Sequence, residues 1–512
     1  MRVLLIRPYF EMLRHELVFL PFEPLGLEYL KSALLTENHR VEIYDCLTEH
    51  PQNIRHLKEK NLFRCGSEEK DIVKKIKDFE PDVVGISGMF YSQASSFYRI
   101  ADLVKKINPR IFVVGGGAFP SAYKEKTLME NKNIDTIVIG EGEETMVELL
   151  KKINNPREIK GICFIDPKSR EIVCNEPRII NMSIDKIIFP YRNFSKIYDY
   201  SKPIGYNYSD KFNLSKLVKS FILYSALSVP VLRFCFSKIF NLRHKNKIKS
   251  LLMPHGFIIT SRSCPNRCGF CAIHKVWGSV YRMRSAQNVL DEIGLLVEHG
   301  IKEIVVVDDN FTVSKKRTIE ICKEIVRRKY NIRLLTPSGI FIPSLDREVL
   351  EHLYEAGLKE LKFGIENGDQ EFLNKVIRKN VNLEQAKKII KEAKEIGFYT
   401  QAFLIFGYPG ETKDTMLKTL RFAFESGVDS ARFYIFQPFP GTQAFEATIK
   451  MGNHNTNFDL GRLKAMTDVP QVETKDFTKN DVKKIYDLAY RTLEKGNYND
   501  IKDRLKEILK WQ

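Results

Sequence analysis

Three cysteines stand within eight residues of this 512-residue chain, and no other feature restricts its fold as strongly. They are Cys264, Cys268 and Cys271, spaced C-x3-C-x2-C directly after the apolar run 256–260, which has the composition of a buried strand. Three thiolates on one loop can hold a four-iron, four-sulfur (4Fe-4S) cluster and leave one iron without a protein ligand. Clusters that only carry electrons normally have every iron held by cysteine, so the spacing predicts that a small molecule binds the fourth iron.

Zinc is the alternative metal for this loop. His274 stands three residues beyond Cys271 and would complete a three-cysteine, one-histidine set, which zinc accepts in closed tetrahedral sites. Zinc loops more often pair C-x-x-C with a second pair of ligands some distance away. The sequence therefore favours iron, and a zinc-stabilised nucleic-acid-binding protein remains as an alternative of a different class.

Strand-like and helix-like segments alternate after the cysteine loop, as a parallel α/β barrel requires. Amphipathic helical stretches cover 286–299, 315–328 and 383–396. Short motifs end the strands between them, at 281–285, 304–311, 363–368, 403–412 and 437–442. Barrel enzymes assemble their sites where strands end and loops begin. We therefore predict a partial α/β barrel from about 254 to 450 with its site along these motifs.

The cysteine spacing, with Phe270 before the last cysteine, and the five later motifs resemble the radical S-adenosylmethionine (SAM) enzymes. The resemblance implies that the amino and carboxylate groups of SAM chelate the open iron. With an external electron donor, reductive cleavage of SAM then yields methionine and a 5'-deoxyadenosyl radical that takes hydrogen from an unactivated carbon. The protein supplies orientation and excludes water.

The same resemblance implies a set of SAM-binding residues. These are Phe270, Asp308, Asp309, Asn310, Glu366, Gly407 and Gly410. Asp308 or Asp309 would pair with the ammonium of SAM, although an acidic residue that closes a strand is as often a helix cap. Glu366 follows an apolar strand at its carboxyl end and would contact ribose or substrate. Gly407 and Gly410 flank a turn that would approach adenine or methionine, or that only needs glycine for its backbone.

The first 155 residues predict a separate α/β domain. Five apolar runs of buried-strand length, separated by helical stretches, predict a five-stranded doubly wound sheet. The runs are 2–6, 41–44, 82–87, 111–114 and 136–139. Open parallel sheets bind large cofactors at the carboxyl ends of their strands. Small or polar residues stand at three of these ends, namely Ser87 and Gly88, then Gly115, Gly116 and Gly117, then Gly140, Glu141 and Gly142.

These loops, with Pro24-Leu-Gly-Leu ahead of a helical stretch, resemble the cobalamin-binding domain that precedes many radical SAM barrels. Domains of this kind that bind cobalt through histidine carry Asp-x-His-x-x-Gly after the first strand. Here that turn reads Arg7-Pro-Tyr-Phe-Glu, and the nearby His15 lacks the aspartate and glycine partners. We therefore expect bound cobalamin to have no protein histidine on its cobalt.

Three further segments complete the predicted organisation. Residues 156–200 form a structured linker with a hairpin around Asp166, 201–253 form an insertion, and 451–512 form a helical carboxyl-terminal region. Within the insertion, 214–249 joins an apolar stretch to a basic run. It is too short to cross a membrane, which takes about 20 apolar residues, and Pro230 and Arg233 interrupt it. It predicts either a peripheral membrane contact, which would favour a lipid-like substrate, or a helical lid on the barrel.

The other six cysteines have no ligand spacing, and we expect ordinary buried thiols. They are Cys46, Cys65, Cys163, Cys174, Cys235 and Cys322. Such usage, and an amino terminus that opens as a strand, predict a reducing, cytoplasmic location. The net charge is +17, but the basic residues spread along helices and do not alternate with exposed aromatic residues. We therefore expect no nucleic-acid partner.

Together these patterns predict a cobalamin-dependent radical SAM enzyme, with methyl transfer to an unactivated carbon as the expected reaction. The resemblance implies that one SAM methylates the cobalamin and a second supplies the radical. The alternative among enzymes is a radical SAM protein whose first domain binds only substrate, as in the methylthiotransferases that act on tRNA. Those enzymes carry three further cysteines in the first domain, whereas this chain has only Cys46 and Cys65 there. The sequence does not indicate the substrate.

Overall fold

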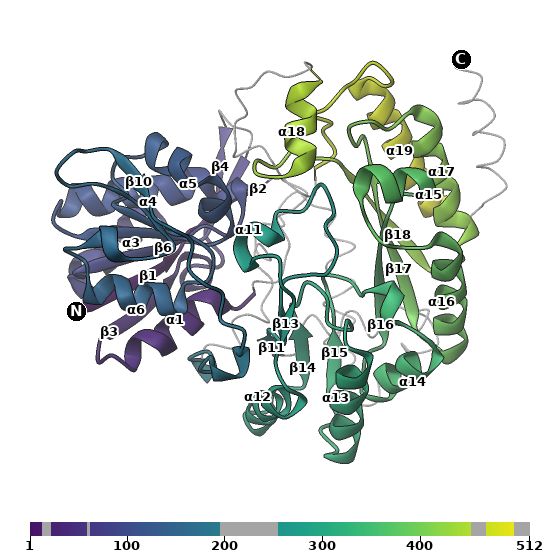
Figure 1. The fold of residues 1–512 in the computed structure, drawn as a ribbon, viewed down its shortest axis with the longest axis horizontal. Coiled ribbons are helices and arrows are strands. Elements are labelled where there is room, and N and C mark those ends of the chain that lie inside the picture. Colours follow the sequence, from purple (N-terminus) through teal and green to yellow (C-terminus); the bar gives the residue numbers. More distant parts are fainter. Residues whose placement is uncertain (13–21, 59–61, 195–253, 452–466, 496–512) are drawn as a thin grey trace.

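The computed structural model describes residues 1–12, 22–58, 62–194, 254–451 and 467–495. The segment 214–249, with His15 and Cys235, lies outside the described residues. Two α/β halves stand side by side, the first drawn in purple and blue and the second in teal to yellow (Figure 1).

A seven-stranded sheet forms the centre of the first half, in the order β10-β9-β8-β7-β6-β1-β3. Its strands are β1 (Arg2–Arg7), β3 (Arg40–Asp45), β6 (Val83–Ser87), β7 (Phe112–Gly116), β8 (Thr136–Val138), β9 (Ile162–Ile165) and β10 (Ile172–Cys174). The five neighbouring strands of this sheet from β3 through β1, β6 and β7 to β8 are parallel. They are the five strands predicted from the apolar runs. The predicted hairpin also forms, as β9 and β10, and it pairs antiparallel with β8 and extends the sheet.

Helices cover both faces of this sheet, which makes the domain doubly wound as predicted. They are α1 (Leu25–Leu35), α3 (Glu69–Phe79), α4 (Ala94–Ile107), α5 (Ala118–Glu130) and α6 (Glu143–Lys151). Successive residues of a strand point to opposite faces. Leu4 and Ile6 of β1 accordingly share one core with α3, α4 and α5, whereas Val3 and Leu5 share another with α1 and α6.

A small antiparallel sheet, in the order β2-β5-β4, and four short helical turns complete the first half. They are β2 (Phe10–Met12), β4 (Ile54–Leu57), β5 (Leu62–Cys65), α2 (Cys46–Glu49), η3 (Tyr91–Gln93), η4 (Pro156–Glu158) and η5 (Ile184–Lys186).

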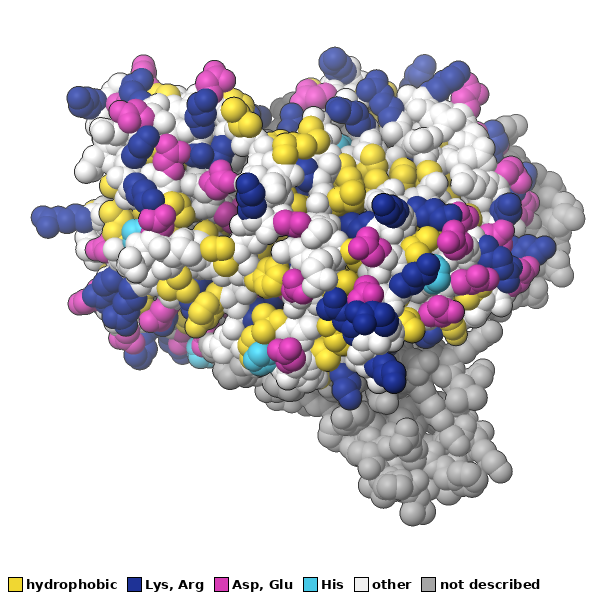
Figure 2. Space-filling model, turned by 60° about the horizontal axis from the view of Figure 1, so that its bottom comes forward, with side chains coloured by type: hydrophobic (Ala, Val, Ile, Leu, Met, Phe, Trp, Pro, Cys, Tyr) yellow, Lys and Arg dark blue, Asp and Glu magenta, His cyan; other side chains and the backbone are white. Residues whose placement is uncertain are grey.

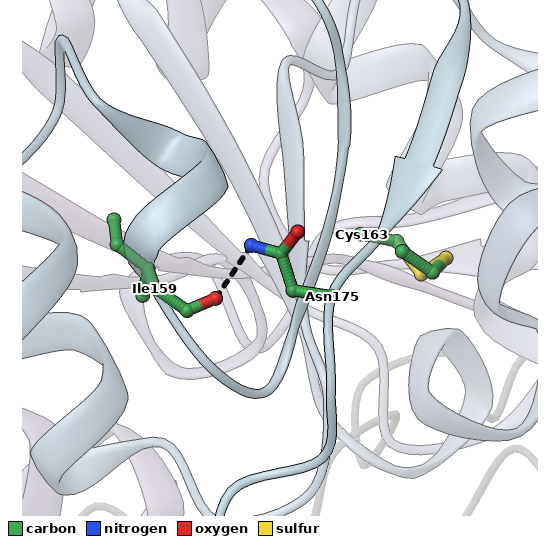
Figure 3. The surroundings of a disulfide bond; sticks show 4 residues. Ile159, Cys163 and Asn175 are labelled. Carbon is green, nitrogen blue, oxygen red and sulfur yellow. Dashed lines mark hydrogen bonds between the residues drawn. A yellow bond between two sulfur atoms is a disulfide. The ribbon is translucent and has the colours of Figure 1, made fainter.

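Cys163 and Cys174 form a disulfide across the β9–β10 hairpin (Figure 3). The antiparallel register sets the two residues directly opposite each other. Beside them, the side-chain amide of Asn175 donates a hydrogen bond to the carbonyl of Ile159 at 2.6 Å. The expectation that both cysteines are free buried thiols is therefore wrong, because the pairing depends on strand register. Cys46, Cys65 and Cys322 are buried and free, as predicted.

Six parallel strands in two groups of three form the second half. The strands are β11 (His255–Ile258), β14 (Glu303–Val306), β15 (Arg333–Leu335), β16 (Glu360–Glu366), β17 (Tyr399–Phe406) and β18 (Ser430–Ile435). Isolated parallel bridges at Leu334–Leu358 and Ile340–Phe363 connect the two groups. The result is the predicted partial barrel, which curves around a single apolar core (Figure 1).

Helices pack outside these strands and at their ends. They are α11 (Ile273–Trp277), α12 (Ala286–Glu298), α13 (Lys315–Arg327), η9 (Ile342–Ser344), α14 (Arg347–Glu355), α15 (Gln370–Phe372), η10 (Leu373–Ile377), α16 (Leu383–Ile396), α17 (Lys413–Glu425), α18 (Gln443–Lys450) and α19 (Lys479–Lys495). A two-stranded ribbon, β12 (Ser261–Arg262) with β13 (Arg282–Met283), flanks the cysteine loop. Four of the longer helices begin with a side-chain cap on a backbone N–H, from Ser285, Ser314, Asn382 and Thr412.

The described surface mixes charges of both signs. Basic and acidic side chains are interspersed over the face in Figure 2. Among the described helices, none combines the length and apolar character that a transmembrane span needs.

Candidate active site

The cysteine loop leaves the barrel after β12 and is fixed by its own backbone. The N–H of Gly269 donates to the carbonyl of Ile377 at 2.9 Å, and the carbonyl of Gly269 accepts from the N–H of Ala444 at 2.8 Å. Cys264 and Cys268 are half-buried and Cys271 is exposed. The two bonds therefore fix the loop in place, and none of its three cysteines is a fully buried residue.

His274 closes the base of the loop. Its Nε2 lies 2.7 Å from the carbonyl of Asn266, and its Nδ1 lies 3.1 Å from the carbonyl of Gly278. Both ring nitrogens thus face backbone carbonyls, and a neutral ring, which carries one N–H, donates to one of them. In this geometry the histidine braces the loop and does not provide the fourth ligand that the zinc alternative requires.

The thiols of the loop lie where a bare thiolate is unfavourable. Burial raises the pKa of the Cys268 thiol to about 12 and that of Cys271 to about 11, and it also raises the pKa of Cys264. Bound metal deprotonates its thiol ligands outright, because its positive charge replaces the lost hydration. The three thiols therefore fit a 4Fe-4S cluster, whose irons would supply that charge.

Asp308 uses its carboxylate to hydrogen-bond residues at the ends of neighbouring strands. Its carboxylate accepts hydrogen bonds from the Thr260 N–H at 2.6 Å, the Thr260 hydroxyl at 2.5 Å and the Ser261 hydroxyl at 2.6 Å. Only 3% of Asp308 is exposed. These bonds tie the end of β14 to the end of β11, so the role of Asp308 is structural. It is not the helix cap of the alternative interpretation, because Ser314 caps α13.

Asp309 and Asn310 lie beside the cysteine loop. The side-chain amide of Asn310 donates to the sulfur of Cys264 at 2.7 Å. Burial, and then the charge of Asp308, raise the pKa of Asp309 to about 7. The Asp309 charge in turn acts on the thiols of Cys264 and Cys271 and raises their pKa. Of the two aspartates, Asp309 is the one whose carboxylate lies near the sulfurs.

Glu366 ends β16 in the left-handed region, with φ of 69°, at an irregularity of the strand pairing. Such a backbone is uncommon outside glycine and often marks a functional position. Its carboxylate binds the ammonium of Lys379 at 2.7 Å, and both side chains are largely buried. The Lys379 charge acts on all three cysteine thiols and lowers their pKa against the effect of burial. Lys379 could not be predicted from the sequence, because nothing in its surroundings distinguishes it from the many other lysines.

The turn after β17 carries Gly407 and Gly410, with φ of 78° and 90°. Both positions need glycine for this backbone conformation. The turn would therefore require these glycines even if they did not contact SAM. Phe270 of the cysteine loop packs edge-on against Tyr408 in this turn, with 6.5 Å between the ring centres. The turn and the cysteine loop therefore contact each other.

Glu411, which the sequence analysis also left without a role, connects this turn to the end of β16. It is fully buried and accepts hydrogen bonds from the Tyr408 N–H at 2.8 Å and the Asn367 amide at 2.7 Å. Burial raises its pKa to about 8. The predicted residues Phe270, Asp309, Asn310, Glu366, Gly407 and Gly410 thus lie along one edge, whereas Asp308 points into the strand ends.

Two of the three predicted cobalamin loops pack on each other. The N–H of Gly88 donates to the carbonyl of Gly116 at 2.7 Å. A Cβ on Gly117 would lie 2.7 Å from the carbonyl oxygen of Gly88, and one on Gly115 would lie 2.6 Å from Phe97. Gly116 differs, because a Cβ there would meet nothing closer than 3.9 Å. Most of these glycines serve packing, and Gly116, which pairs with Ser87 in the sheet, has free space beside it.

The surroundings of these loops suit a large cofactor. Met89 and Phe90, next to Gly88, are 46% and 45% exposed and add apolar surface at the strand ends. The third loop, from Gly140 to Gly142, reaches the barrel half, and Glu141 there forms ion pairs with Arg262 and Arg282. An open glycine backbone beside apolar side chains fits the flat, largely apolar ring of cobalamin.

The comparisons agree with both halves of this site. Residues 258–423 match the radical SAM superfamily and residues 18–150 match the B12 binding domain. An uncharacterized methyltransferase of Pyrococcus horikoshii is 30% identical over 492 residues, which cover 96% of this chain and 92% of that protein. The cytidylyl-2-hydroxyethylphosphonate methyltransferase of Streptomyces wedmorensis is 29% identical over 479 residues, 90% of this chain and 84% of that protein.

Solved structures support the fold. The radical SAM methyltransferase TsrM from Kitasatospora setae, with cobalamin and a [4Fe-4S] cluster bound, has a TM-score of 0.61 at 20% identity, covering 88% of this chain and 76% of that one. The cobalamin-dependent radical SAM enzyme OxsB, with aqua-cobalamin bound, has a TM-score of 0.58 at 19% identity, covering 82% of this chain and 52% of that one. The chain belongs to the radical SAM superfamily, in the group whose barrel follows a B12-binding domain.

Proposed function

We propose that this enzyme uses a 4Fe-4S cluster, SAM and cobalamin to transfer a methyl group to an unactivated carbon of a small molecule. The proposal rests on a contact between the two proposed cofactor edges, namely the strand ends with the cysteine loop in the barrel half and the strand ends with the glycine loops in the B12-binding half. Helix α11 begins directly after Cys271, and the carbonyl of Val276 in that helix lies 3.0 Å from the Cβ position of Gly140 in the third loop of the B12-binding half. Two relatives with methyltransferase names, similar over most of their length, support the same reaction.

The cluster loop and its neighbours supply the proposed SAM site. Cys264, Cys268 and Cys271 hold the cluster, which, once reduced by an external electron donor, supplies the electron for radical formation from SAM. Asp309 pairs with the ammonium of SAM. Glu366 accepts a hydrogen bond from a ribose hydroxyl. The remaining contacts that we propose come from Phe270, Asn310, Gly407 and Gly410.

The sheet edge of the first half supplies the proposed cobalamin site, with Ser87, Gly88, Gly115, Gly116, Gly117, Gly140, Glu141 and Gly142 along it. Other side chains occupy the turn after β1, where a cobalt-binding histidine would stand. Arg7 there bonds to Asp45 at 2.7 Å, and Tyr9 is 1% exposed. We therefore propose that cobalt has no protein histidine. The cob(II)alamin EPR spectrum tests this, and we expect no nitrogen splitting from a lower ligand. Splitting would mean that His15, another histidine or the cofactor's own base occupies the cobalt, and splitting that changes on ¹⁵N-labelling of the protein would contradict the proposal.

The substrate we propose is a small molecule, and we propose a cytoplasmic enzyme. A lipid-like substrate is the second candidate, favoured by the apolar and basic residues of 214–249. Co-sedimentation with anionic liposomes tests that candidate. Equal pelleting of the full chain and of a variant without residues 217–249 would remove its support.

An anaerobic reconstitution tests the main proposal. The protein, loaded with iron, sulfide and cobalamin, is incubated with a reductant, methyl-deuterated SAM and fractionated cell extract. The expected result is 5'-deoxyadenosine together with a deuterated methyl group in one extract compound. Formation of 5'-deoxyadenosine that is independent of cobalamin would support the alternative in which the first domain binds only substrate. Zinc without iron in the purified protein would contradict both.

A further inference from the structure

Four charged side chains cross the boundary between the two halves, two buried arginines and two half-buried glutamates. Arg262 and Arg282 come from the ribbon beside the cysteine loop, and Glu141 and Glu143 come from the loop that opens α6 in the B12-binding half. Arg262 donates to Glu141 and to Glu143, each at 2.5 Å, through different nitrogens. Arg282 donates to the other oxygen of Glu141. We call these four residues the interdomain clamp.

The clamp is well sealed and internally neutral. The side chains of Arg262 and Arg282 are 3% and 1% exposed. The guanidinium of Arg262 lies over the ring of Trp277 at 4.9 Å, which covers it on one side. Burial alone would raise the pKa of Glu143, but the charge of Arg262 brings it below its ordinary value. Buried charges persist only when they are paired, so two cations and two anions hold one another in place.

The clamp joins the two proposed cofactor edges. Arg262 stands two residues before Cys264, and Glu141 stands between Gly140 and Gly142. We propose that Arg262 is a positioning residue, which fixes the cobalamin-binding edge at a set distance from the cluster loop. This inference rests on the proposed function for its consequence, because chemistry that uses both cofactors needs their reacting groups held in a defined geometry.

A second set of contacts holds the halves together elsewhere. Glu23 of the first half accepts a hydrogen bond from the Phe257 N–H at 2.9 Å. Arg192 pairs with Glu292 at 2.7 Å and also lies 3.7 Å from Glu23. Loss of the clamp should therefore loosen the two cofactor edges without separating the halves.

The test compares Arg262→Met with a matched control in the full-length protein. Glu148→Gln is the control, because Glu148 also lies on α6. This substitution removes an ion pair with Arg178, but both of these residues belong to the first half, so no contact between the halves is lost. Hydrogen exchange is measured first, with no cofactor added. In Arg262→Met, exchange of the amides in 140–143 should become about a hundredfold faster or more, since one lost partner leaves a buried charge uncompensated. In Glu148→Gln it should stay as in the parent protein.

The second measurement uses protein loaded with iron and cobalamin. Pulsed EPR gives the distance between the reduced cluster and cob(II)alamin, which both carry an unpaired electron. The parent and Glu148→Gln should give one narrow distribution, Arg262→Met a broadened or displaced one, and Arg262→Lys an intermediate one, because lysine reaches only one carboxylate at a time. Unchanged exchange or an unchanged distance in a loaded Arg262→Met protein would overturn the inference. Failure of the parent itself to load cobalamin would instead overturn the proposed function, and hydrogen exchange would still decide whether the clamp holds the two edges.

Discussion

The two cofactor edges both lie at the carboxyl ends of parallel strands, yet they are built in opposite ways. At the barrel edge, side chains carry the chemistry. Asn310 donates a hydrogen bond to the sulfur of Cys264, and the charge of Lys379 acts on the thiols. At the edge of the first half, the proposed site consists mainly of backbone, and Gly88, Gly115 and Gly117 are needed for packing whether or not a cofactor binds. A cysteine motif thus identifies its chemistry directly, whereas a glycine motif does so only when packing has been separated from binding.

The largest effect should come from the cysteine loop. Alanine at Cys264, Cys268 or Cys271 removes a ligand, and the iron content should fall from roughly four per chain with complete loss of 5'-deoxyadenosine formation. Iron analysis and product analysis under anaerobic conditions measure both. Cys322→Ala, a buried thiol in α13, should keep iron and activity. Retention of full iron by all three loop variants would contradict the cluster assignment.

Two neighbouring glycines separate packing from binding at the other edge. Gly117→Ala places a methyl group 2.7 Å from a carbonyl oxygen at a φ of 107°, and should lower the free energy of unfolding by about 3 kcal/mol. Gly116→Ala has free space and should change it by less than about 1 kcal/mol, but should reduce cobalamin loading. Chemical denaturation and the absorbance of bound cobalamin measure the two effects. If Gly116→Ala loads cobalamin normally, the cofactor does not lie against this strand end.

Lys379→Met tests the ion pair beside the cysteine loop. The substitution leaves the buried carboxylate of Glu366 without its cation and should cost about 2–4 kcal/mol of unfolding free energy. It also removes a positive charge near the thiols, so the midpoint potential of the cluster should become more negative. Lys375→Met is the control, because its ion pair with Glu371 is exposed and should contribute at most about 1 kcal/mol. Equal potentials in the parent and Lys379→Met would contradict an electrostatic role.

A smaller effect should appear in the pH dependence of stability. The pKa of Glu411 is about 8 in the folded protein and 4.5 ordinarily, so the folded state binds this proton more tightly. Its contribution is fully present below pH 4.5 and is lost as the pH rises through about 8. Glu411→Gln should remove this loss and cost about 1–3 kcal/mol at low pH, because an amide nitrogen cannot accept one of the two buried hydrogen bonds. Denaturation from pH 5 to 8 shows whether the variant has the flatter profile. Parallel profiles would mean that Glu411 stays ionised.

The sequence predicted what depends on local pattern. The five apolar runs of the first half became the parallel strands, and the turn at Asp166 became a hairpin. It did not predict that the hairpin joins the sheet and sets Cys163 opposite Cys174, because strand register is a long-range property. Asp308 illustrates the same limit in the site, since only its spatial partners distinguish a structural carboxylate from a binding one.

Arg262 and Lys379 were missed for a related reason. Each is a basic residue in a chain rich in them, and its importance comes from its carboxylate partners. Those of Arg262 are 121 and 119 residues away, and that of Lys379 is at the end of a different element, β16. Arg262 stands two residues before Cys264, but nothing in the sequence indicates that its partners are in the other half.

Helix α19 packs against the turn beside the cysteine loop, although it is made much later than the loop. Val482 of this helix lies 3.1 Å from the Cβ position of Gly407, and Tyr490 donates a hydrogen bond to the carbonyl of Phe433 at 3.2 Å. The turn beside the cysteine loop is therefore supported by one of the last described elements of the chain. During synthesis the ribosome releases the cysteines long before α19. The loop is therefore made before the helix that completes its surroundings.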